Sequence, residues 1–193
     1  MGPIYPILFK FVVEKLTGRT RGPGIFLPKF RLGFASPSQP ARPPCGYANT
    51  GAMFHYPDFF KVGVSQAGNH DNRVYEDDWG EKWQGLLTRD PDCGTNYDSQ
   101  ANQNFAANLK GKLLLAHGTM DANVPFYSTL LVVDALIAAN KDFDLILLPN
   151  RTHGFGNEPY MMRRRWDYFV EHLLGAEPPD DYEFAQPTPR RPR

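Results

Sequence analysis

The amino-acid sequence predicts an α/β fold in which helices cover both faces of a mostly parallel sheet. The prediction rests on an alternation in the second half of the chain, where short and almost wholly apolar runs precede longer segments with helical periodicity. Apolar strands of this kind are typical of parallel sheets that are buried on both faces. Strands that alternate with helices are typical of α/β domains.

Three apolar runs predict the strands: residues 61–67 (KVGVSQA), 112–116 (KLLLA) and 143–148 (FDLILL). Two segments predict the helices. Residues 125–139 begin with a proline, which is favourable at the first helical position, and contain few polar residues. Residues 160–174 place apolar side chains at helical spacing, with Arg163–Arg165 on the face expected to be exposed to solvent.

Composition divides the 193 residues into three parts. Residues 1–45 are rich in proline and basic residues and lack sustained periodicity, so they predict neither long helices nor central strands. Residues 46–175 contain the regular elements. Residues 176–193 are again proline-rich and predict a flexible extension.

The 21 Lys and Arg residues equal the 21 Asp and Glu residues, so the overall charge predicts neither nucleic acid nor an anionic membrane as a partner. No segment approaches the ~20 consecutive apolar residues of a membrane span. The two cysteines, Cys45 and Cys93, match no metal-ligand spacing, so no metal site is expected. Nothing in the sequence indicates a cofactor, an oligomeric state or a cellular compartment.

Two residues with catalytic chemistry follow neighbouring predicted strands. Asp121 comes after residues 112–116, and His153, within the stretch PNRTHGFG, comes after residues 143–148. In parallel sheets ligand chemistry collects at the carboxyl ends of the strands, so both side chains are expected on one rim. They suit the last two members of a Ser-Asp-His triad, which follow the nucleophile in this order. The structural alternatives are that Asp121 caps loop amides and that His153 is an ordinary loop histidine.

From about Gly46 to Leu174 the sequence resembles the C-terminal half of the catalytic domain of prolyl oligopeptidase-family serine peptidases, in particular the dipeptidyl-peptidase-IV-like branch. Three stretches provide the resemblance: GYANTGAMFHYPDFFKVGVSQAGNHDNRVYEDDWGEKWQGLL, LLLAHGTMDANVPF and THGF. The resemblance implies an α/β-hydrolase fold, here truncated because the first strands of the sheet are missing, and a peptide as substrate.

The same resemblance implies roles for individual residues. It makes Asp121 the acid and His153 the base of the triad, and it places Asn123 against the substrate backbone. It also implies that three further residues line the pocket for the substrate residue before the scissile bond: Tyr75, Trp79 and Val124. From the residues alone, core packing is an equal alternative for Tyr75, Trp79 and Trp83.

The family's nucleophile motif, Gly-x-Ser-x-Gly-Gly, is not found where it is expected. Directly before GYANTGAMF the chain has ARPPC, so Pro43 takes the place of the serine. Pro44 takes the place of the residue whose amide donates to the oxyanion, and proline has no N–H. Ser38, in a register with an insertion, and Cys45, as a thiolate, are the two alternative nucleophiles, but neither lies in a sequence typical of a nucleophile turn.

The sequence therefore predicts a serine-type peptidase domain with acid and base retained and the nucleophile lost, and hence negligible peptide hydrolysis. Two alternatives from other classes remain open. One is a catalytically inactive module that binds peptides or other partners. The other is the product of a truncated or frame-disrupted gene that does not form a stable protein.

Structural roles are expected for the remaining polar residues. His117 is predicted to be a turn residue after its strand rather than a metal ligand beside Asp121. An acidic run near His70 and Asp71 is predicted to be a solvated, hydrogen-bonded loop rather than a cation site. The run consists of Glu76, Asp77, Asp78 and Glu81.

Overall fold

The computed structural model describes residues 46–91 and 94–180. The leader, with Ser38 and Cys45, lies outside the described residues, as do Cys93 and residues 181–193 of the tail. The central sheet has three parallel strands in the order β1 (Val62–Gln66), β4 (Lys112–Gly118) and β5 (Asp144–Leu148). Because all three strands are parallel, their carboxyl ends lie along one edge of the sheet.

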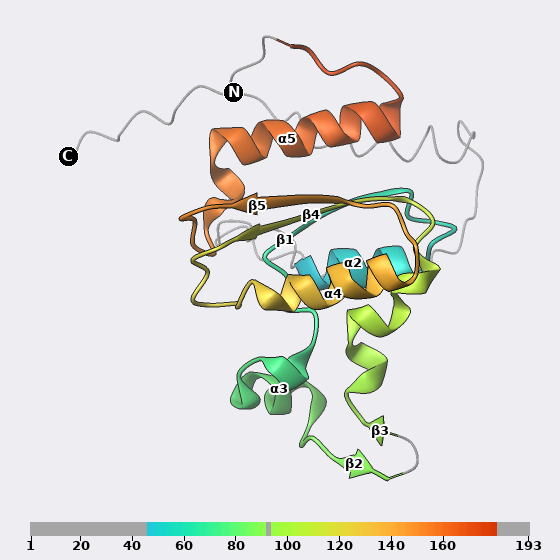
Figure 1. Ribbon diagram of the computed structural model, residues 1–193, viewed down its shortest axis with the longest axis vertical. Helices are drawn as coiled ribbons and strands as arrows, with labels where there is room; N and C mark the ends of the chain where they lie inside the picture. The colour runs from blue at the N-terminus through green and yellow to red at the C-terminus, as the bar shows by residue number, and fades with distance from the viewer. Residues whose placement is uncertain (1–45, 92–93, 181–193) are drawn as a thin grey trace, which may run out of the picture. The chain divides into compact units, whose positions relative to one another are not determined.

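Helices cover both faces of this sheet. Figure 1 shows α2 (Gly46–His55) and α4 (Tyr127–Ala138) on one face and α5 (Pro159–Phe169) on the other. The last helix continues as a π-helical turn, Val170–Leu174. The structure therefore confirms the predicted α/β fold, with each predicted strand and helix displaced by only a few residues at its ends.

Alternate residues of β4 enter two separate cores. Leu113 and Leu115 pack with Met53 of α2 and Leu136 of α4, whereas Leu114 belongs to the core on the α5 side. Both faces of β4 are thus buried, which explains why its sequence is continuously apolar rather than alternating.

Two helices were not predicted. In α2 the buried face consists of Gly46, Thr50, Met53 and Phe54, which have helical spacing, but Gly46 has no side chain and Thr50 has a polar one. Helix α3 (Asp77–Gln84) corrects the expected acidic loop. Its acidic residues are exposed, as expected, but Glu76 is the N-cap and Asp77, Asp78 and Glu81 lie within the helix. Asp77 and Asp78 are in the first turn, where the helix dipole favours negative charge.

The segment between β1 and β4 is mostly irregular. After α3 the chain forms a short antiparallel pair, β2 (Arg89–Asp90) with β3 (Gly94–Thr95), and then two 3₁₀ segments, Asp98–Gln100 and Asn102–Asn108. The second of these returns to the sheet and packs against α2 and α4. Within the described residues, no helix combines the length and the apolar character that crossing a membrane requires.

Candidate active site

The loops that follow β4 and β5 are joined by backbone hydrogen bonds. The amide of Thr119 donates to the carbonyl of Leu148 (3.1 Å), and the amide of Met120 donates to that of Arg151 (3.0 Å). Any side chain at Gly118 would overlap the Arg151 carbonyl, so the absence of a Cβ lets the loops approach this closely. This contact brings together Asp121 and His153, which are far apart in the sequence.

The carboxylate of Asp121 has two distinct sets of partners. Its Oδ1 accepts hydrogen bonds from the backbone amides of Asn123 (3.0 Å) and Val124 (2.9 Å). Its Oδ2 lies 2.8 Å from Nδ1 of His153. The geometry therefore combines both predicted interpretations of this residue, because one oxygen caps the loop while the other contacts the histidine.

The contact with Asp121 determines which nitrogen of His153 has the proton. A carboxylate only accepts hydrogen bonds, so Nδ1–H of His153 donates, and in the neutral ring Nε2 keeps its lone pair. The side chain is 47% exposed, and among the described residues Nε2 has no hydrogen-bond partner. An oriented imidazole with an accessible, unprotonated nitrogen is the arrangement that a general base requires.

Helix α2 begins beside the loop that contains His153. A Cβ on Gly46, its first residue, would lie 2.5 Å from the carbonyl oxygen of Gln66 at the end of β1. The side chain of Gln66 in turn lies 3.2 Å from the position that a Cβ on Gly156 would take. The start of α2 and the histidine loop therefore have a common neighbour. In the sequence, the expected nucleophile position, Pro43, comes three residues before Gly46.

The residues predicted to contact substrate lie in two places. Asn123 is exposed and Val124 is buried, both directly after Asp121. Tyr75 is partly buried, and its ring packs edge to face on that of Trp79, with centroids 6.4 Å apart. Tyr127, in the first turn of α4, donates a hydrogen bond of 2.6 Å to the carbonyl of Val74, which connects the aromatic pair to that helix.

Exposure distinguishes between the two interpretations of the tryptophans. Trp79 is 48% exposed and Trp83 is 64% exposed, and their rings are in edge-to-face contact, with centroids 5.8 Å apart. Neither ring is part of the core, so the core-packing alternative is wrong for both. For Tyr75, which is partly buried, the alternative stays open.

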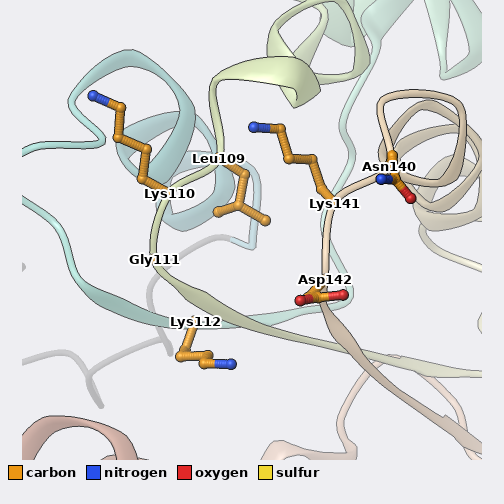
Figure 2. Close-up of a pocket in the computed structure, with 7 residues that line it drawn as sticks. All are labelled: Leu109, Lys110, Gly111, Lys112, Asn140, Lys141 and Asp142. Atoms are coloured by element: carbon orange, nitrogen blue, oxygen red, sulfur yellow. The ribbon is translucent and has the colours of Figure 1, made fainter.

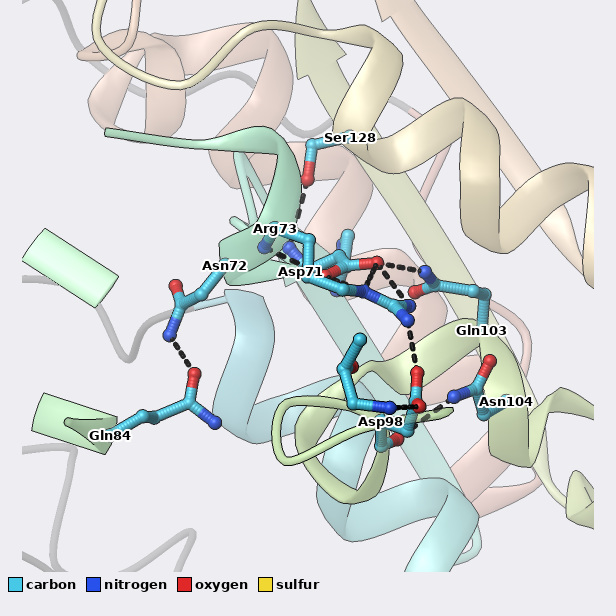
Figure 3. A network of polar contacts seen from close by, with 10 residues as sticks. Asp71, Asn72, Arg73, Gln84, Asp98, Gln103, Asn104 and Ser128 are labelled. Atoms are coloured by element: carbon cyan, nitrogen blue, oxygen red, sulfur yellow. Dashed lines mark hydrogen bonds and ion pairs between the residues drawn. The ribbon is translucent and has the colours of Figure 1, made fainter. Parts of the chain in front are cut away.

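Figure 3 shows the polar contacts that hold the segment before Tyr75. We call Asp71, Arg73, Asp98 and Gln103 the loop cluster. Arg73 donates to the carboxylates of Asp71 and Asp98, and Gln103 donates to Asp71 as well. Burial raises the pKa of Asp71, but the hydrogen bonds from Arg73 and Gln103 outweigh it, so the pKa lies below its usual value. Asp71 is therefore held as a carboxylate.

His117 differs from its predicted role. It lies within β4 rather than in a turn, and its side chain is fully buried. Its ring nitrogens lie close to Asp121, Val124 and Thr129. Among the residues that the structure describes, no group of three or more metal-binding side chains is suitably placed for an ion.

A surface cavity of about 230 Å³ lies away from these residues. Figure 2 shows its lining, which includes Lys110, Lys112, Lys141 and Asp142. Lys112 begins β4 and Asp142 precedes β5, so the cavity is at the amino ends of these strands. Asp121 and His153 follow the carboxyl ends, so the cavity is not part of the candidate active site.

A parallel sheet with helices on both faces, together with an acid and a histidine after successive strands, defines the α/β-hydrolase class. Residues 46–176 match the prolyl oligopeptidase family (Peptidase S9). The chain belongs to this family of peptidases.

Individual relatives agree with this assignment. The chain is 29% identical over 116 residues to dipeptidyl peptidase family member 1 of Caenorhabditis elegans. The matched region covers 60% of the chain and 14% of that protein. It is 28% identical over 114 residues to mouse prolyl endopeptidase FAP, covering 58% and 15%. The crystal structure of Porphyromonas gingivalis dipeptidyl peptidase 4 superposes with a TM-score of 0.57 at 26% identity, covering 68% and 18%. The chain thus spans about a seventh of the length of these curated relatives.

Proposed function

We propose that residues 46–176 form the acid–base half of a serine-peptidase active site, with His153 as the general base and Asp121 as the acid that orients it. The substrate class is peptides, in keeping with the family. The observation on which this proposal rests is the 2.8 Å hydrogen bond between His153 and the buried carboxylate of Asp121, which leaves Nε2 without a partner among the described residues.

In the proposed reaction Nε2 of His153 takes the proton of a nucleophilic hydroxyl as the oxygen attacks the peptide carbonyl. Asp121 keeps the ring in the tautomer with Nδ1–H and stabilises the imidazolium that forms. The imidazolium then protonates the leaving amine as the C–N bond breaks, which produces an acyl-enzyme. Water hydrolyses this ester with the same base, and the nucleophile recovers its proton.

The predicted substrate residues have supporting positions. Asn123 follows Asp121 directly and is exposed, which suits a contact with the substrate backbone. Trp79 is half-exposed and its ring packs on that of Tyr75, so the pair offers an apolar surface for a substrate side chain. Val124 is buried, so its proposed contribution is to the floor of that pocket.

For the chain with ARPPCG at residues 41–46, we expect negligible hydrolysis. Loss of the serine from a comparable triad lowers kcat by roughly a millionfold. The purified chain should therefore not be labelled by a fluorophosphonate probe, which reacts with activated serines. Labelling that disappears in Ser38→Ala would show instead that Ser38 is the nucleophile.

Restoring the motif tests the acid–base pair directly. In the ungapped register, the substitutions Ala41→Gly, Pro43→Ser, Pro44→Ala and Cys45→Gly recreate Gly-x-Ser-x-Gly-Gly before α2. We expect fluorophosphonate labelling of this variant and its loss on adding His153→Gln. His172→Gln, in the π-helical turn, is the matched control and should leave labelling intact. A restored variant that unfolds cooperatively but is not labelled would overturn the proposal.

A second candidate function, peptide binding without turnover, is favoured by the exposed aromatic pair Trp79 and Trp83. A fluorescein-labelled, proline-containing hexapeptide should then bind the unmodified chain in a polarisation assay. Binding should weaken in Asn123→Ala and in Tyr75→Ala. Equal affinity in both variants and in the unmodified chain would exclude this site as the place of binding.

A further inference from the structure

The side chain of His117 contacts the candidate acid from the interior of the protein. Its Nε2 lies 3.2 Å from Oδ2 of Asp121 and 3.0 Å from the carbonyl oxygen of Val124. Its Nδ1 lies 2.7 Å from the hydroxyl of Thr129 in α4. The side chains of His117 and Asp121 are both 0% exposed, so these contacts are shielded from water.

The partners of each nitrogen determine the tautomer of this ring. The carbonyl and the carboxylate near Nε2 only accept hydrogen bonds, so Nε2 carries the proton. The Thr129 hydroxyl can donate, and it therefore satisfies the lone pair of Nδ1. Burial lowers the pKa of His117, against the opposing effects of Val124 and Asp121. The ring is consequently neutral, and a single tautomer satisfies every contact.

This arrangement places His117 against the carboxylate of Asp121 on the side facing the protein interior. Its Oδ1 accepts two backbone amides, and its Oδ2 accepts the Nδ1–H of His153. The same Oδ2 lies 3.2 Å from Nε2 of His117, whose N–H donates to the carbonyl of Val124. The three hydrogen bonds and the contact with His117 hold both oxygens, so the carboxylate cannot rotate without losing a hydrogen bond. Because His117 donates as a neutral ring, the negative charge of Asp121 is not cancelled by a second cation.

We propose that His117 is a positioning residue, which holds Oδ2 of Asp121 in the orientation that His153 requires. The inference rests on the proposed function, in which Asp121 orients the general base. His117 does not contact the substrate or the reacting atoms. Its effect is transmitted through Asp121, and Thr129 fixes the ring from the opposite side.

A purely structural histidine would connect β4 to α4 through Thr129 and would have no effect on His153. Both roles predict that removing the ring lowers stability, so stability alone does not distinguish them. The distinguishing signal is the rate at which the Nδ1–H proton of His153 exchanges with water. Only the positioning role makes this exchange rate depend on His117. This proton is observable by NMR without any catalytic activity.

The experiment uses the full chain, labelled with ¹⁵N. Long-range ¹H–¹⁵N correlation spectra should show His117 in the Nε2–H tautomer at pH 7. In His117→Leu, the Nδ1–H proton of His153 should exchange with water about tenfold faster, because Oδ2 of Asp121 loses a buried polar contact comparable in strength to one hydrogen bond. His117→Gln, whose amide replaces the Nε2–H donor, should retain most of the protection, and the remote control His172→Gln should retain all of it.

Two results would overturn the inference: an Nδ1–H tautomer for His117, or an unchanged exchange rate for His153 in folded His117→Leu. If that variant does not fold, Thr129→Val removes the hydroxyl at nearly constant volume. It should also accelerate exchange at His153, and Thr129→Ser should restore the rate. Failure of the serine-restored chain to react would disprove the proposed function but would leave these ring measurements unaffected.

Discussion

Two buried carboxylates in this chain have contrasting partners. Asp71, in the loop cluster, pairs with the guanidinium of Arg73, whose positive charge is permanent. Asp121 has no such partner among the described residues: its hydrogen bonds come from two backbone amides and the imidazole of His153, and the imidazole of His117 lies 3.2 Å away. Both side chains are almost completely buried.

The difference separates a structural carboxylate from one with the potential for chemistry. The charge of Asp71 is matched by the permanent charge of Arg73 (Figure 3), so the pair can fix a loop but does not change its charge at neutral pH. The charge of Asp121 faces His153, whose own charge changes when it takes a proton. A buried carboxylate can therefore assist proton transfer only where a titratable group, rather than a fixed cation, is its partner.

The largest expected effect comes from removing the fixed cation. Arg73→Met should lower the free energy of unfolding by about 3–5 kcal/mol, because Asp71 is left buried without a counter-charge. Asp121→Asn should cost only about 1–2 kcal/mol, because the side-chain oxygen still accepts the two amides. Urea denaturation measures both. The double variant Asp71→Asn/Arg73→Met should recover part of the stability lost in Arg73→Met. Equal losses of stability in Arg73→Met and Asp121→Asn would contradict the contrast between the two carboxylates.

An effect of intermediate size is expected from pH on the free energy of unfolding, through His70, a buried histidine next to Asp71 of the loop cluster. Burial, with a smaller contribution from His117, lowers the pKa of His70 to about 3. The unfolded chain therefore binds a proton below about pH 6.5 that the folded chain excludes, and stability falls as the pH decreases from there towards 3. From pH 7 to pH 5, His70 should account for a loss of about 2 kcal/mol.

The variant His70→Asn keeps an acceptor for the Asn102 side chain and should remove this part of the pH dependence. Urea denaturation at pH 8, 7, 6 and 5 measures it for both proteins. Between pH 8 and 7 the imidazole is largely neutral in both states, so that interval is an internal control. If the two proteins lost stability in parallel down to pH 5, His70 would not be the group responsible.

The smallest effect is expected from an exposed ion pair on the loop that holds His153. Arg151 and Glu158 approach to 2.7 Å, but the Arg151 side chain is 47% exposed. Because water screens such pairs, Arg151→Ala should change the free energy of unfolding by less than about 1 kcal/mol. Adding about 0.5 M salt should reduce the difference further. A loss as large as that in Arg73→Met would mean that exposure does not distinguish the two arginines.

The sequence by itself predicted the strands and the two long helices because burial on both faces leaves a continuous apolar pattern, as in Leu113, Leu114 and Leu115. It also placed Asp121 and His153 on one rim, since parallel strands end at the same edge. Helix α2 was missed because part of its buried face is Gly46 and Thr50, where close approach rather than apolarity determines burial.

Only the tertiary structure determined how the polar side chains pair. The sequence has His117 at the end of an apolar run, but its position within β4 follows from pairing with Leu147 of β5. Its ring then lies between Asp121 and Thr129 of α4. In the same way, Arg73 meets Asp98 only because the chain between them returns through α3 and the β2–β3 pair. Buried apolar residues recur at regular positions along the chain, so they can be recognised from the sequence. A hydrogen bond requires two particular atoms at about 3 Å, and this depends on every connection between them.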